Sequence, residues 1–210
     1  MTLTGGKIWG EVSESFLSTL KNNLSAGGKT YRPVSLWINW PVTDNSKQHL
    51  ILGGGEKFLH PNVDPSLLSG IMLNPMQQSE PSKIALFAGA QYSWKQWKSE
   101  EEAKKINDIA FNFVENGHFE DSKVSAAFRE LGKHMINQNM DNRVVKLEES
   151  VELAPKLTDF MTKLKAGQDV TAERATLRAE FAKIKEAAEL YKALGDKKMV
   201  AQIHYWLDNA

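Results

Sequence analysis

The 210-residue sequence contains no cysteine, which excludes disulfide bonds, zinc–thiolate sites and a cysteine nucleophile. Its 26 basic side chains are balanced by 26 acidic ones, so the chain lacks the basic excess of most nucleic-acid-binding proteins. No apolar run approaches the roughly 18 residues that a membrane-spanning helix needs, and residues 1–10 lack the basic and apolar regions of a signal peptide. We therefore expect a globular protein that neither binds nucleic acid nor inserts into a membrane.

The sequence also lacks the common motifs of catalytic and cofactor sites. The glycines at residues 53–55 are not followed by Lys and Ser or Thr, so they favour a flexible surface loop over a phosphate-binding loop. The five histidines show no zinc-ligand spacing, and no Gly-x-Ser-x-Gly motif is present. Adjacent acidic residues at 100–102 and 148–149 fall on predicted helices, where a solvated face is the simplest interpretation. The residues by themselves predict no cofactor, no metal and no acid/base centre.

Composition changes near residue 98. Residues 1–98 contain six of the seven prolines, ten of the 14 glycines and five of the six tryptophans. Residues 99–210 contain one proline and long stretches rich in Ala, Glu, Lys and Leu, a composition typical of helices. The change predicts two domains, residues 1–98 and residues 99–210.

The first part favours a mixed α/β structure. Short apolar runs predict strands at residues 34–40, 70–73 and 83–88, and residues 1–4 are interpreted as the remnant of another strand; a helix is expected over residues 12–24. This pattern is typical of a mostly parallel sheet covered on both faces. Asn39 and Asn74 stand where two of these strands end, the place where α/β sheets and barrels bind ligands. The pattern alone nevertheless favours ordinary turn residues at both positions.

The second part has apolar residues at the 3.6-residue period of amphipathic helices. The stripes fall at residues 106–114, 128–136, 157–164, 177–191 and 199–206. Thr171 is predicted to cap the start of the fourth helix, and Gly195 is predicted to end it. Such helices joined by short loops predict a helical bundle.

Residues 36–44, LWINWPVTD, resemble the W-x-N-[FW]-P-V-[ST]-D motif of bacterial glycoside hydrolase family 84. The resemblance continues through HLILG at residues 49–53 and LSGIMLNPM at residues 68–76. It extends over residues 80–87 and into the helices from residue 127 onward. The sequence is therefore similar to this family along nearly its whole length.

The resemblance implies a (β/α)8 barrel that removes terminal GlcNAc with retention of configuration, the substrate's own acetamido carbonyl acting as nucleophile. The family's two adjacent catalytic aspartates lie on its fourth barrel strand, and this sequence contains no Asp-Asp. A complete barrel needs about 250 residues. We therefore expect residues 1–98 to form about strands six to eight of a barrel, residues 99–210 to form the helical bundle domain behind it, and the chain to be inactive alone.

The same resemblance assigns four substrate-binding residues and no catalytic residue. Asp44 would accept hydrogen bonds from the sugar O4 and O6, while Asn39 and Asn74 would contact the sugar and neighbouring catalytic groups. Trp37 would form a wall of the pocket that holds the acetamido group. No metal or cofactor is implied.

The implied partner is a GlcNAc-containing glycan or glycoprotein, and the parent protein is expected to be secreted or on the bacterial cell surface. Two alternatives stay open. The first alternative is that the chain is a non-catalytic carbohydrate- or partner-binding module. The second is that it is part of a hyaluronan-degrading hyaluronidase. Strands without their barrel neighbours also predict self-association through an open sheet edge.

Overall fold

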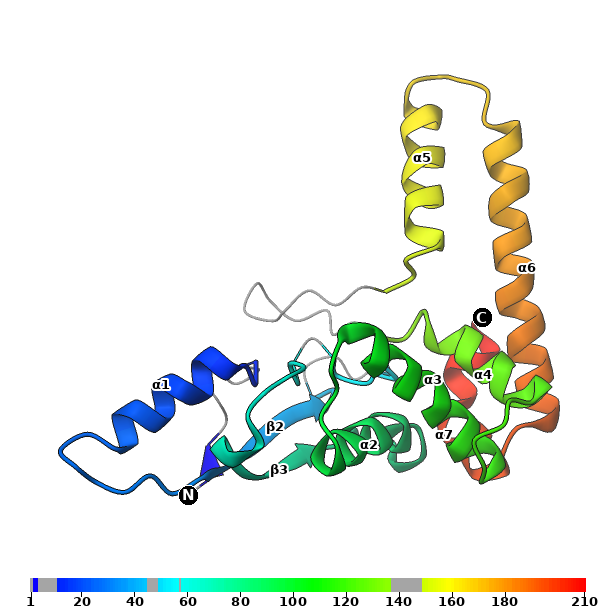
Figure 1. Ribbon diagram of the computed structural model, residues 1–210. Helices are drawn as coiled ribbons and strands as arrows, with labels where there is room; N and C mark the ends of the chain where they lie inside the picture. The colour runs from blue at the N-terminus through cyan, green and yellow to red at the C-terminus, as the bar shows by residue number, and fades with distance from the viewer. Residues whose placement is uncertain (1, 4–10, 45–48, 57, 137–148) are drawn as a thin grey trace.

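The computed structural model describes residues 2–3, 11–44, 49–56, 58–136 and 149–210, and within them a small sheet leads into a group of helices (Figure 1). The strands are β1 (Thr2–Leu3), β2 (Val34–Pro41) and β3 (Leu68–Asn74), with the short 3-10 helix η1 (Pro65–Leu67) before β3. The α-helices are α1 (Glu14–Leu24), α2 (Ser79–Trp94), α3 (Glu100–Asn116), α4 (Lys123–Gly132), α5 (Leu153–Lys165), α6 (Thr171–Leu194) and α7 (Lys197–Asp208).

The sheet is parallel, in the order β1-β2-β3, as the sequence predicts. Side chains alternate along β2, so that Val34, Leu36 and Ile38 are buried, and α2 packs on the sheet. On the opposite face, Trp37 is 40% and its β3 neighbour Met72 is 41% exposed. We expected both faces to be covered, but within the described ranges this second face is open. Parallel sheets are normally buried on both sides, so an open face is unusual for such a sheet. No strand among the described residues pairs with the outer edge of β3.

Residues 83–88, predicted to form a strand, lie in α2 instead. Ile84, Ala88 and Tyr92 are buried at four-residue intervals, which is the period of a helix. The prediction was wrong because a short apolar run cannot separate a buried strand from a buried helix. At Gly89 a side chain would collide with Leu73 of β3, so the glycine permits close approach of helix and sheet.

The second part of the chain is helical, and the predicted helices are confirmed with two adjustments. Helix α4 ends at Gly132, so Met135 and Ile136 lie beyond it. Thr171 does not cap α6; the N-cap is Val170, and the Asp169 carboxylate accepts hydrogen bonds from the Thr171 backbone N–H and hydroxyl. No helix in the described ranges is long and apolar enough to cross a bilayer.

One aromatic core joins these helices. Phe128 of α4 packs edge-on against Phe111 of α3 and stacks on Tyr191 of α6, with ring centroids 5.2 and 4.5 Å apart. The Tyr191 hydroxyl donates a 2.6 Å hydrogen bond to Glu115 of α3. Because the buried cluster runs without interruption from Val12 to Leu207, the division into residues 1–98 and 99–210 stays a prediction.

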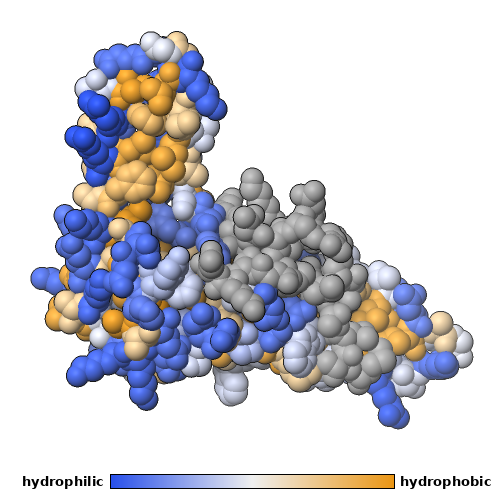
Figure 2. Space-filling model, turned by 180° about the vertical axis from the view of Figure 1, so that it is seen from behind, coloured by the Kyte–Doolittle hydropathy of each residue, from blue (hydrophilic) through white to orange (hydrophobic). Residues whose placement is uncertain are grey.

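Helices α5 and α6 form an antiparallel hairpin that stands out from the rest of the molecule (Figure 1). The C-terminal half of α6 packs on α4 and α7, whereas its N-terminal half packs along α5. Seen from behind, the hairpin displays a column of apolar side chains between hydrophilic edges (Figure 2).

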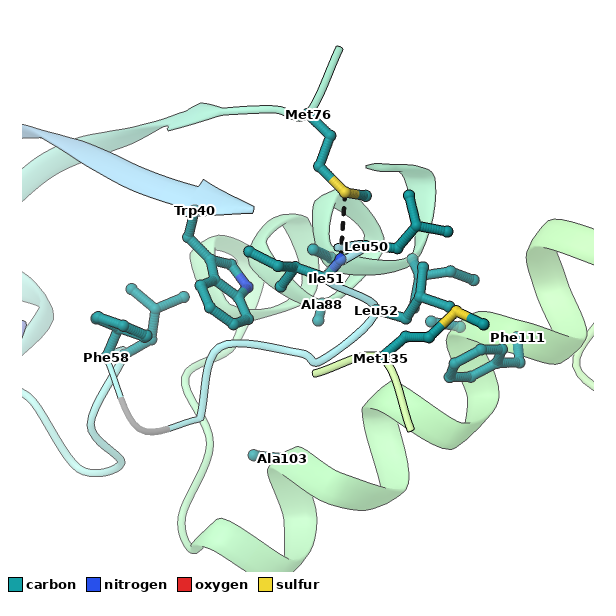
Figure 3. Close-up of a cluster of buried hydrophobic side chains, with 14 of the residues drawn as sticks. Trp40, Leu50, Ile51, Leu52, Phe58, Met76, Ala88, Ala103, Phe111 and Met135 are labelled. Carbon is teal, nitrogen blue, oxygen red and sulfur yellow. Dashed lines mark hydrogen bonds between the residues drawn. The ribbon is translucent and has the colours of Figure 1, made fainter. Parts of the chain in front are cut away.

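The segment after β2 folds under the sheet as a buried loop (Figure 3). Leu50, Ile51 and Leu52 are fully buried, and the Ile51 N–H points at the Met76 sulfur at 3.2 Å. The glycines at residues 53–55 are buried as well, so the prediction of a surface loop was wrong. Gly53 and Gly55 pack against the indole of Trp40, whose Nε1–H donates to the Gly53 carbonyl at 3.1 Å.

Candidate functional site

Three of the four predicted site residues meet at the carboxyl end of the sheet. The Asn74 side-chain amide donates a hydrogen bond to Oδ1 of Asn39 at 3.1 Å, and the Trp37 indole N–H donates to the same oxygen at 2.8 Å. A register shift between Ile38 and Pro41 sets Pro41 opposite Asn74, so that the last residue of β3 comes within reach of Asn39. Parallel strand ends thus gather two amides and an indole at one edge.

These hydrogen bonds fix the orientation of the polar groups. An indole N–H is a donor only, so the Asn39 atom that receives it is the carbonyl oxygen. That oxygen then accepts two hydrogen bonds, which hold the Trp37 ring against the exposed face of β2. An exposed ring held in this way offers an apolar surface beside amide groups, the combination that suits a sugar's C–H and hydroxyl groups.

Asp44, the fourth predicted residue, lies three positions beyond the end of β2. Val42 and Thr43 are buried, at 5% and 4% exposure, and Asp44 follows them as an exposed side chain. Among the residues that the structure describes, Asp44 forms no hydrogen bond or ion pair. The structure therefore leaves Asp44 outside the hydrogen-bonded group of Trp37, Asn39 and Asn74, and the binding roles of all four residues stay predictions.

Contacts from distant parts of the chain support this strand end, and sequence reasoning missed them. The Gln202 side chain of α7 accepts a 2.8 Å hydrogen bond from the Glu80 N–H and donates a 3.0 Å bond to the Ser79 hydroxyl. It thereby caps α2, which has no side-chain cap of its own. The loop between Asn74 and α2 is further tied by the Met76 N–H, which donates to Ser82. No local pattern signals the role of Gln202, because 122 residues separate it from its partner.

Cavities lie elsewhere in the described part of the molecule, and two of them adjoin helices α2, α3 and α4. One, of about 240 Å³, lies between the residue 53–56 loop, α3 and α4. The other, of about 320 Å³, lies beside the start of β3 and the end of α2, where Trp94 is 90% exposed. Neither is lined by the predicted site residues, and no cluster of metal-ligating side chains occurs in the ranges described above.

Comparison with known proteins places the chain in a family. Residues 1–133 match the family described as β-N-acetylglucosaminidase. The chain belongs to this family. Residues 152–209 match a second family, described as hyaluronidase post-catalytic domain-like. The predicted membership of glycoside hydrolase family 84 is thereby confirmed.

Solved structures of the family fit the same assignment. The structure of CpGH84D superposes with a TM-score of 0.80 at 28% identity, covering 98% of this chain and 32% of that one. A mutant of the O-GlcNAc hydrolase from Thermobaculum terrenum gives a TM-score of 0.69 at 21% identity, covering 99% and 41% respectively. At 21% identity, the similarity to the Thermobaculum terrenum protein shows the fold alone. The chain spans less than half the length of either protein, and its parallel sheet and helices correspond to part of a (β/α)8 barrel followed by a helical domain.

Proposed function

We propose that the chain forms the sugar-binding side of a retaining, substrate-assisted β-N-acetylglucosaminidase site. The observation that carries the proposal is the shared Oδ1 of Asn39, which ties Trp37 and Asn74 together at the carboxyl end of two adjacent strands. In (β/α)8 barrels this end is where substrates bind. Membership of the glycosidase family supports a GlcNAc-containing glycan or glycoprotein as the ligand.

Each residue has a distinct part in this proposal. The Asn39 and Asn74 amides hydrogen-bond the sugar and set the position of groups beside it. Trp37 packs its exposed ring against the acetamido side of the sugar. Asp44, an exposed carboxylate beyond the strand end, accepts hydrogen bonds from O4 and O6. The exposed position of Asp44 suits a group that engages only when substrate is present.

The chain binds in this proposal but does not turn substrate over. Substrate-assisted hydrolysis needs one carboxylate to orient the acetamide and another to move a proton, and the sequence holds no Asp-Asp to supply them. We accordingly expect no hydrolysis of an aryl GlcNAc substrate by this chain. Measurable turnover with a bell-shaped pH profile would refute the missing-catalyst part of the proposal.

Calorimetric titration with an oxazoline-mimicking GlcNAc inhibitor tests the binding residues. We expect weak saturable binding that falls at least about ten-fold in Asn39→Ala, the loss of one or two hydrogen bonds. Ser35→Ala is the matched control, because Ser35 lies on the same face of β2 and bonds Ser69 at 3.0 Å instead of the site. A specific complex that neither Asn39→Ala nor Asp44→Ala weakens would show that the site is misassigned.

Hyaluronan degradation is the second candidate for the parent enzyme. The match of residues 152–209 to a domain described as hyaluronidase post-catalytic domain-like favours it. Viscometry of hyaluronan with the whole enzyme distinguishes the two, since terminal GlcNAc removal leaves the polymer length almost unchanged. Action on extracellular glycans also fits a secreted or surface-bound bacterial parent, which we propose as its location.

A further inference from the structure

The α5–α6 hairpin has an apolar face that the described remainder of the protein leaves open. Leu157, Met161 and Leu164 of α5 recur at positions i, i+4 and i+7, and Phe181 lies across from them on α6. Met161, Leu164 and Phe181 are 44%, 48% and 49% exposed. These four residues are called the hairpin face below. Figure 2 shows an apolar column on the hairpin seen from behind.

On the opposite face of the hairpin, ion pairs join α5 to α6. Lys156 bonds Glu180 at 2.7 Å, and Lys163 bonds Glu173 at 2.5 Å, in each case from α5 to α6. Asp159 adds a 2.9 Å bond to Lys163. The two sides therefore differ sharply, one polar and satisfied within the hairpin, the other apolar and half exposed. Exposed apolar surface of this kind marks an interaction site.

The edge of the hairpin face is basic. Arg174, Arg178 and Lys185 follow the same stripe of α6 as Phe181, and all three are exposed. Lys185 lies 3.8 Å from the Glu189 carboxylate. At the hairpin tip, hydrogen bonds from Thr171 lower the pKa of Asp169, and the nearby charge of Arg174 lowers it further. Arg178 has no ion-pair partner among the residues that the structure describes. Positive charge thus extends along one edge of the apolar column.

We propose that the hairpin face binds an acidic amphipathic helix of a partner protein. The 13 residues of α5 span about 20 Å, the length of a helix of three to four turns. A third helix laid along the hairpin face would bury the exposed Met, Leu and Phe side chains, and acidic residues at its edge would meet the arginines.

Two other occupants fit the face less well. A second copy paired about a two-fold axis that runs across the helices would bring the basic edge of one hairpin against the basic edge of the other, which is unfavourable. An anionic bilayer would attract the same charges, but the hairpin face carries neither Trp nor Tyr, the residues enriched at membrane interfaces. The combination of a narrow apolar stripe and a basic edge favours a single acidic helix.

Fluorescence anisotropy with two synthetic helical peptides tests the proposal on the whole chain. The first peptide carries Leu at i, i+4 and i+7 with Glu at its edges, and the second replaces every Glu by Lys. We expect the acidic peptide to bind at least about ten-fold more tightly, with an affinity that weakens several-fold as salt rises from about 0.05 to 0.5 M. Equal affinity for both peptides, or no binding of either, would overturn the proposal.

Variants locate the binding surface. Met161→Glu should weaken binding of the acidic peptide about ten-fold or more. Thr162→Glu, the same change one residue away on the outer side of α5, should leave that affinity unchanged. The double change Arg174→Glu and Arg178→Glu should reverse the preference toward the basic peptide. Circular dichroism melts establish that each variant is folded.

Three results would contradict the assignment. The first is an equal loss of affinity for the acidic peptide in Met161→Glu and Thr162→Glu, which would show that the peptide does not bind at the hairpin face. The second is self-association of the chain that Met161→Glu abolishes, which would make the occupant a second copy. The third is binding to vesicles rich in phosphatidylserine that exceeds binding to the acidic peptide.

Discussion

Replacing Gly55 by alanine should destabilise the loop that holds Trp40 in place. Gly55 has a φ of +82°, in the left-handed region that an alanine adopts at a cost of about 1–2 kcal/mol. A Cβ at this position would also lie 3.1 Å from Nε1 and 3.2 Å from Cδ1 of Trp40. The ring cannot easily move, because it is 1% exposed and packs on Phe58 with centroids 5.0 Å apart.

The expected loss of stability combines the strain in the backbone at residue 55 with the close contact between the new Cβ and Trp40. Alanine restricts the unfolded chain and returns about 0.4–1 kcal/mol, while overpacking against a rigid ring costs at least about 1 kcal/mol. The net loss in the free energy of unfolding is at least about 1 kcal/mol. For a domain of this size, that lowers Tm by at least about 2 °C. Since Trp40 directly follows Asn39, we also expect weaker binding of the GlcNAc inhibitor.

Differential scanning calorimetry and urea unfolding measure the effect. Gly70→Ala is the matched control, because no heavy atom lies within 4 Å of a Cβ at that position. We expect Gly70→Ala to leave the free energy of unfolding unchanged or to raise it by up to about 1 kcal/mol. If Gly55→Ala and Gly70→Ala had the same Tm, the reasoning about the Trp40 loop would be refuted.

Three further predictions follow from buried polar groups and from the open sheet. Tyr191→Phe leaves Glu115 without its 2.6 Å donor, and chemical denaturation should show a loss of about 1–3 kcal/mol. Burial lowers the pKa of His134, so the unfolded state takes up its proton first, and stability should fall as pH drops below about 6.5; His134→Gln should flatten that decline in pH-dependent melts. Light scattering should show self-association through the sheet edge, reduced by Met72→Lys on the open face; a strict monomer at all concentrations would contradict this.

The sequence was sufficient to predict elements whose pattern is local. The short apolar run at residues 34–40 and the helical stripes after residue 99 depend on neighbours in the chain, and the structure confirms both elements. The strand predicted at residues 83–88 was wrong because its run of five apolar residues fits either period. The surface loop predicted at residues 53–55 was wrong because these glycines pack on Trp40, Ala88 and Asn107, which only the tertiary structure brings against them.

The sequence predicted which residues belong to the candidate site but not how they are arranged. The family resemblance pointed to Trp37, Asn39 and Asn74, yet no spacing rule predicts that one oxygen accepts from the other two side chains. That contact depends on an irregular register between β2 and β3, which is set by pairing across strands. The support from Gln202 likewise arises only when α7 packs on α2.

The most direct test of the sugar-binding account is the NMR signal of the Trp37 indole N–H. This proton sits in the 2.8 Å hydrogen bond to Asn39, so a bound sugar should change its chemical environment. Titration with GlcNAc or the oxazoline-mimicking inhibitor should shift the Trp37 signal saturably, while the signal of Trp94, which is 90% exposed and lies elsewhere, should stay fixed. An unchanged Trp37 signal, or equal shifts of both indoles, would contradict the account.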